Sequence, residues 1–130
     1  MKSFRSVASA LAAAALVVSA PVLAHPKLLT ATPAEASTTR SVTRITLAFS
    51  EPLVAQFSGL EVVMTSMPGM AMAGPHTMKI AGVRVSVAPD GKTLIAALAR
   101  PLAAGTYVVN WHAVSKDTHK IAGKLTFTVR

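Results

Sequence analysis

The stretch Val42-Thr43-Arg44-Ile45-Thr46-Leu47-Ala48-Phe49 decides the fold class of this chain. Ile45, Leu47 and Phe49 fall on one face of an extended backbone. Arg44, Thr46 and Ala48 fall on the other face. Strict alternation of this kind is typical of a strand with one buried face. Ser50-Glu51-Pro52 follows at once, so we expect the strand to end there.

Six further short segments have the same extended character. They cover residues 27–32, 59–63, 83–87, 93–98, 107–113 and 125–129. Pro89 and Gly91 suit a tight turn between two of these segments, which predicts a hairpin. About seven strands spaced roughly ten residues apart, with almost no helical period after residue 24, predict an all-β chain. We expect an antiparallel Greek-key β-sandwich or small barrel.

The N-terminus has the features of a secretory signal peptide. Lys2 and Arg5 precede an apolar, alanine-rich run, and Val22-Leu23-Ala24 ends in the small residue that signal peptidase accepts. The apolar run is too short to cross a bilayer comfortably, so we expect export and cleavage rather than a membrane tether. Residues 1–24 are then removed, and residues 25–130 form one domain that begins at His25.

Composition narrows the function. Without Lys2 and Arg5 the exported chain has eleven basic and five acidic residues, a net charge of +6. The basic residues stand singly with little aromatic interleaving, so we expect no nucleic-acid partner. The chain has no cysteine, so its stability must come from packing, and a blue-copper electron-transfer site, which needs a thiolate, is excluded. We expect a monomer.

A methionine-rich segment runs from Met64 to Met78. It holds five of the chain's six methionines within fifteen residues, and two prolines and two glycines within it deny it a helical backbone. We therefore expect a loop, where core filling is a poor explanation for so many thioethers. Thioether sulfur is neutral and polarizable and selects Cu(I), and His76 could add a nitrogen donor. The alternative is an adaptable apolar loop that contacts a partner or covers a core edge.

A second set of donors comes from the two ends of the exported chain. After cleavage His25 offers its α-amine and its imidazole, while Asp117 and His119 lie in the turn between the last two strands, where alternate residues can point the same way. Two imidazoles, an amine and a carboxylate suit Cu(II) better than Cu(I). Pro26 has no amide hydrogen, so a further donor must come from elsewhere in the fold. The alternative is a frayed terminus and ordinary polar groups in a turn.

Several segments spread over the exported chain match one known family. They are His25-Pro26-Lys27-Leu28, Phe49-Ser50-Glu51, Gln56-Phe57-Ser58-Gly59, Met64-Thr65-Ser66-Met67-Pro68-Gly69-Met70, Ala104-Gly105-Thr106-Tyr107, Trp111 and Asp117-Thr118-His119. On these residues the chain resembles the periplasmic copper resistance proteins CopC and PcoC. The resemblance implies a cupredoxin-like or immunoglobulin-like barrel without a blue-copper site, holding Cu(I) at one end and Cu(II) at the other.

The resemblance also implies ligands for each ion. It implies Cu(I) ligation by Met64, Met67 and Met70, Cu(II) ligation by His25, Asp117 and His119, and a carboxylate near the second site at Glu51. The sequence departs from the family pattern after Met70, because Met72 is unusual there and His76 and Met78 are spaced differently. Which of these three completes the Cu(I) sphere stays open, as does the choice between the two carboxylates.

These features predict a periplasmic copper carrier or chaperone in copper resistance and homeostasis, not an enzyme. By resemblance, its partner is an inner-membrane CopD-type copper importer or another periplasmic copper protein. One alternative is a copper-dependent oxidative enzyme that uses the N-terminal histidine. A carboxylate ligand would then block oxygen activation, and we expect the aromatic residues to be committed to strands rather than to a substrate-binding surface. The other alternative is a β-sandwich interaction module that uses the methionine-rich segment for protein contact.

Overall fold

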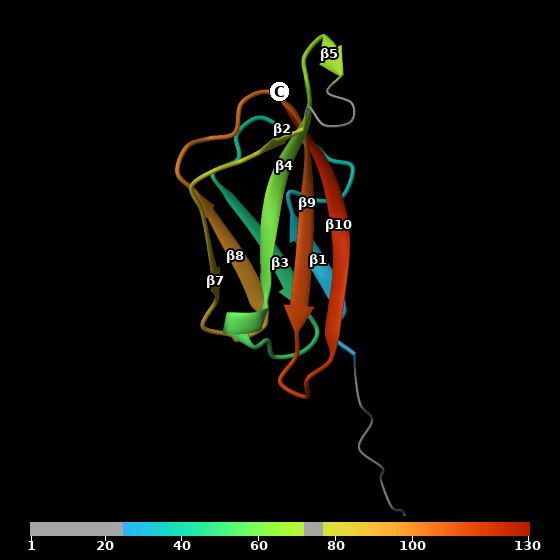
Figure 1. Ribbon diagram of the computed structural model, residues 1–130, viewed down its shortest axis with the longest axis vertical. Coiled ribbons are helices and arrows are strands. Elements are labelled where there is room, and N and C mark those ends of the chain that lie inside the picture. Colours follow the sequence, from blue (N-terminus) through green and yellow to red (C-terminus); the bar gives the residue numbers. More distant parts are fainter. Residues whose placement is uncertain (1–24, 72–76) are drawn as a thin grey trace, which may run out of the picture.

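The computed structural model describes residues 25–71 and 77–130, which fold into two β-sheets that form a sandwich (Figure 1). The smaller sheet has four antiparallel strands in the order β1-β3-β8-β7. Their bounds are Leu28–Thr32 (β1), Arg44–Phe49 (β3), Thr93–Leu98 (β8) and Val83–Val87 (β7). The predicted hairpin joins β7 to β8. Asp90 fastens its turn by accepting hydrogen bonds from the backbone of Lys92 and Thr93, which hold the pKa of Asp90 below its ordinary value.

The larger sheet has six strands, of which five follow the order β2-β10-β9-β4-β5, and β6 also pairs with β4. Their bounds are Thr38–Thr39 (β2), Lys120–Val129 (β10), Gly105–Val114 (β9), Gly59–Met67 (β4), Met70–Ala71 (β5) and Met78–Lys79 (β6). The β2–β10 pair is parallel and the remaining pairs are antiparallel. A short 3-10 turn, η1, covers Ala55–Phe57 between β3 and β4.

The all-β fold class expected from the sequence is confirmed. The seven expected segments correspond to the seven strands of five or more residues, and β2, β5 and β6 were not expected because two residues show no alternation. Phe57 is a correction: the sequence placed every aromatic residue in a strand, but Phe57 lies on η1 and is 58% exposed. It follows the break at Pro52, where extended pairing has already ended.

The core lies between the two sheets and uses the inward positions that alternation predicts. Ile45 and Leu47 are fully buried, and Phe49 meets Trp111 edge to face with ring centroids 5.2 Å apart. Tyr107 stacks on the ring of Phe127 at 5.6 Å. The Phe49–Trp111 pair crosses between the sheets, whereas Tyr107 and Phe127 are neighbours within the larger sheet, and all four rings belong to one apolar cluster.

The methionine-rich segment is not a loop throughout, contrary to expectation. β4 continues through Met67, and its backbone pairs with β9 and with both β5 and β6, so its polar groups are satisfied without water. Met64 is 5% exposed and belongs to the core, so one thioether does fill it. The breaks at Pro68 and Gly69 come only after these residues.

Three expectations fall outside the described ranges: the signal peptide at residues 1–24 and the donors Met72 and His76. Within residues 25–71 and 77–130, no helix has both the length and the apolar character needed to cross a membrane.

Candidate metal centres

The segment that begins at His25 is held against the sandwich by buried and hydrogen-bonded residues. Pro26 is fully buried. Next to it, Lys27 N donates to Ser50 Oγ at 2.9 Å, and Ser50 N donates back to Lys27 O at 2.9 Å. Because two consecutive residues are fastened in this way, the backbone at His25 has a defined place at the end of β3.

The turn between β9 and β10 is fixed by its own hydrogen bonds. Ser115 N donates to His119 O at 2.9 Å and Thr118 N donates to Ser115 O at 2.9 Å. Thr118 has a φ of +73°, a left-handed conformation that lets the chain reverse within few residues. The hydroxyl of the buried Ser115 donates to Asp117, and this hydrogen bond orients the carboxylate.

These two elements bring three predicted ligands together. The imidazole rings of His25 and His119 meet edge to face with centroids 4.5 Å apart, and His119 Nδ1 lies 3.2 Å from Asp117 Oδ2. Both His119 and Asp117 keep about a third of their side-chain surface exposed, 32% and 35% respectively. The cluster therefore rests on the buried residues Pro26 and Ser115, and its side chains remain partly open to solvent.

The electrostatics of this cluster favour a bound cation. The Ser115 hydroxyl, which donates to the carboxylate, and then the nearby His119 hold the pKa of Asp117 below its ordinary value, so the ionised form of the carboxylate is favoured. His119 Nδ1 is buried and, despite its closeness to Asp117, has no hydrogen-bond partner of acceptable direction among the described residues. A buried ring nitrogen without a partner is unusual, and a metal ion is one way to satisfy it.

The cluster is not a complete metal cage. Among the described residues, no three His, Asp or Glu side chains already stand at metal-binding spacing. The fourth predicted donor is an amine, which the chain acquires only when residue 24 is removed. The donor types nevertheless fit Cu(II), which prefers nitrogen and oxygen ligands in a tetragonal arrangement.

The backbone of Glu51 lies near this cluster, but among the described residues its carboxylate makes no ion pair with it. Lys116 N donates to Pro52 O at 3.1 Å and Leu53 bridges to Ser115, which places the Glu51 segment beside the β9–β10 turn. The ion pairs among the described residues join Lys79 to Glu61 and His119 to Asp117, so the Glu51 carboxylate is in neither of them. Asp117 therefore has the stronger geometric claim to the carboxylate position.

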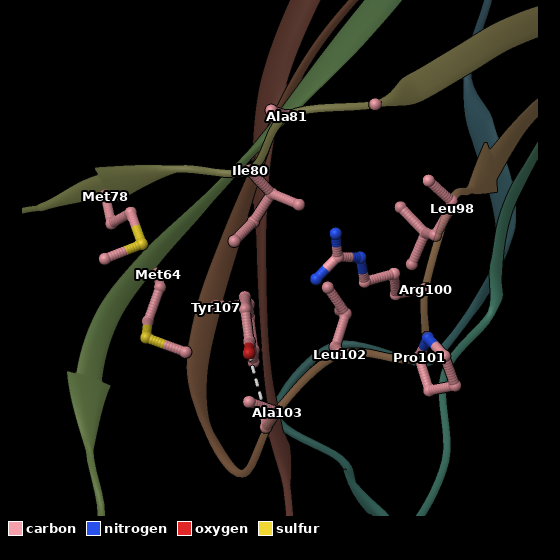
Figure 2. A pocket seen from close by; sticks show the side chains of 12 residues that line it. Met64, Met78, Ile80, Ala81, Leu98, Arg100, Pro101, Leu102, Ala103 and Tyr107 are labelled. Carbon is pink, nitrogen blue, oxygen red and sulfur yellow. Dashed lines mark hydrogen bonds between the residues drawn. The ribbon is translucent and has the colours of Figure 1, made fainter.

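The sulfur donors form two groups rather than one. Met64 and Met78 are register partners across β4 and β6, and both line a cavity of about 420 Å³ (Figure 2). Met67 is 40% exposed and lines a different cavity with Pro68, and its backbone pairs with that of Met70. The structure thus brings Met64 and Met78 together and directs Met67 elsewhere.

The sulfur donors and the cluster of His25, Asp117 and His119 lie toward opposite ends of the sandwich. Figure 1 shows β5 at one tip and the β9–β10 turn at the other, with β9 and β10 running between them. Ser115, which orients Asp117, was missed by sequence reasoning. It continues the inward series of Tyr107, Trp111 and Ala113 on β9, so its burial could have been inferred from the same alternation.

Comparison with known proteins assigns the chain to a family. The family model described as the CopC domain matches residues 28–130. The chain belongs to the CopC family. Within it, Copper resistance protein C of Pseudomonas syringae pv. tomato is 52% identical over 118 residues, which span 91% of this chain and 90% of the relative. Copper resistance protein C of Xanthomonas campestris pv. juglandis is 40% identical over 131 residues, which span 100% of both.

The fold of this CopC-family chain also matches a solved structure. PcoC, a methionine-rich copper resistance protein from Escherichia coli, is similar with a TM-score of 0.72 and 40% sequence identity, over 82% of this chain and 100% of PcoC. The family resemblance predicted from the motifs is confirmed.

Proposed function

We propose that this protein is a periplasmic copper carrier in copper resistance and homeostasis, with a separate site for each oxidation state of the ion. The observation that carries the proposal is the contact between His25 and His119, whose ring centroids are 4.5 Å apart although the residues come from opposite ends of the exported chain. Two imidazoles beside a carboxylate, where a new N-terminus would form, match the donor preference of Cu(II).

The proposed Cu(II) ligands are the α-amine and imidazole of His25, the imidazole of His119 and the carboxylate of Asp117. The lowered pKa of Asp117 supports its role because ligation needs the ionised form. The unpartnered Nδ1 of His119 supports the role of that ring. Glu51 is the alternative carboxylate, supported by the backbone link between Pro52 and Lys116.

The proposed Cu(I) site is built on the thioethers of Met64 and Met78. Their register pairing and shared cavity support this choice, since two neutral sulfur donors on adjacent strands face one space. The remaining candidates for the Cu(I) sphere are Met67, Met70, Met72 and His76.

The proposed activity is binding and transfer rather than turnover. Cu(I) prefers the thioether site and Cu(II) prefers the nitrogen and oxygen site, so the oxidation state of the ion decides which site holds it. The partner we propose is an inner-membrane CopD-type importer or another exported copper protein.

Burial of Tyr107, Trp111 and Phe127 supports the view that these rings do not form a substrate-binding surface, as an oxidative enzyme would need.

Replacing His119 by alanine tests the Cu(II) site. We expect His119→Ala to weaken Cu(II) binding by at least about 100-fold, because it removes a ligand and leaves Asp117 without its neighbour. The measurement is a Cu(II) titration followed by Trp111 fluorescence, with competing chelator to set the free ion concentration.

The matched control is His112→Ala, which removes an exposed histidine of β9 that lies outside the cluster. We expect it to bind Cu(II) as the unchanged protein does. A Cu(II) affinity of His119→Ala equal to that of the unchanged protein would contradict the proposed Cu(II) site, and loss of affinity in both variants would point to His112 as an additional ligand.

A further inference from the structure

The cavity beside Met64 and Met78 contains a charge that the proposed copper site does not explain. Its wall is formed mainly by apolar side chains, including Ile80, Leu98 and Leu102. Figure 2 shows the guanidinium of Arg100 extending into the cavity between Ile80 and Leu102. Among the described lining residues, Arg100 is the charged one.

Arg100 has no counter-charge in the described part of the chain. The ion pairs found there join Lys79 to Glu61 and His119 to Asp117, and neither involves Arg100. A guanidinium is always protonated and presents a planar fork of donors that suits carboxylates and other anions. Arg100 is exposed to solvent, and because it also lines the cavity, its donors face the same space as the two thioethers.

This arrangement creates a charge problem for a Cu(I) ion. Thioethers are neutral, so Cu(I) bound by Met64 and Met78 keeps its full positive charge. A second unit charge on the exposed Arg100, at the same cavity, repels that ion. One monoanion between the two cations would turn both interactions into attractions.

We propose that the cavity takes up Cu(I) together with one monoanion, a halide or a carboxylate, which Arg100 recognises. This inference rests on the proposed Cu(I) function of Met64 and Met78. It assigns to Arg100 the role of selecting how Cu(I) arrives: as a complex with an anionic ligand rather than as the bare cation. A free halide and the carboxylate of a donor molecule or partner protein share this chemistry.

The test is a partition of Cu(I) between the exported protein and a chromophoric Cu(I) chelator, without oxygen and at constant ionic strength. Partition is the suitable measurement because chloride binding to Cu(I) in solution affects both competitors equally. The salt is perchlorate, chloride or acetate. We expect the affinity of the unchanged protein to rise about tenfold from perchlorate to chloride or acetate.

In Arg100→Gln the rise should disappear, and in perchlorate the variant should bind Cu(I) about fivefold more tightly than the unchanged protein, because the repulsion is gone. Arg44→Gln is the matched control: it removes one arginine from β3, which does not line the cavity, and should behave as the unchanged protein does. A response to chloride alone identifies a free halide, and a response to acetate identifies a carboxylate.

Two outcomes would overturn the inference while leaving the proposed function in place. One is Cu(I) binding that does not depend on the anion and is equal in Arg100→Gln. The other is an anion response that persists in Arg100→Gln, because the copper ion alone would then hold the anion. If the unchanged protein binds no Cu(I) in any salt, the proposed Cu(I) function fails and this inference fails with it.

Discussion

Adding one alanine before His25 should weaken Cu(II) binding by at least about 100-fold. The extension turns the amine of His25 into a peptide amide, a poor ligand at neutral pH, and moves the new amine about 3.5 Å along the chain. The buried Pro26 and the paired Lys27 and Ser50 do not allow the terminus to slide back by one residue. The measurement is the Cu(II) titration followed by Trp111 fluorescence.

The same extended protein supplies its own controls. Its thermal stability without metal and its Cu(I) affinity should equal those of the protein that begins at His25, because Met64 and Met78 lie beside the start of β9, away from the β9–β10 turn. A Cu(II) affinity reduced less than threefold would show that the α-amine is not a ligand.

Replacing Phe127 by alanine should remove about 3–5 kcal/mol from the free energy of unfolding. Phe127 is fully buried in β10 and stacks on Tyr107 at 5.6 Å, so its loss leaves a cavity between the sheets that β9 and β10 cannot close. A domain of this size has a total stability of only about 5–15 kcal/mol. The measurement is denaturant unfolding of the apo protein followed by Trp111 fluorescence.

Lys124→Ala is the control for this change, because Lys124 is an exposed residue of the same strand. We expect it to alter the free energy of unfolding by less than about 0.5 kcal/mol. A loss below about 1 kcal/mol in Phe127→Ala would contradict the packing described for the core.

The main strands could be predicted because their burial follows the alternation of the sequence. Ile45, Leu47 and Phe49 are buried in the positions that a period of two requires. The extension of β4 through Met67 could not be predicted in the same way, because methionine has weak strand preference and Pro68 lies close by. Its pairing with β6 depends on residues far along the chain, which a local pattern does not contain.

The nitrogen and oxygen cluster was easier to predict than the sulfur group. His25, Asp117 and His119 have chemistry that differs from their surroundings, and their expected places at a terminus and a turn put them at one end of the fold. The methionines are chemically alike, so the sequence did not indicate that Met64 would meet Met78 while Met67 faces a different cavity. Arg100 carried no sequence signal, because only the folded chain directs it into that cavity.

The central claim, two independent sites for two oxidation states, is tested most directly by loading both ions into one molecule. The exported protein first receives one equivalent of Cu(II), recorded by electron paramagnetic resonance, and then one equivalent of Cu(I) without oxygen. We predict two bound copper ions by native mass spectrometry and an unchanged Cu(II) spectrum. A single bound copper ion, or loss of the Cu(II) spectrum as Cu(I) binds, would contradict this account.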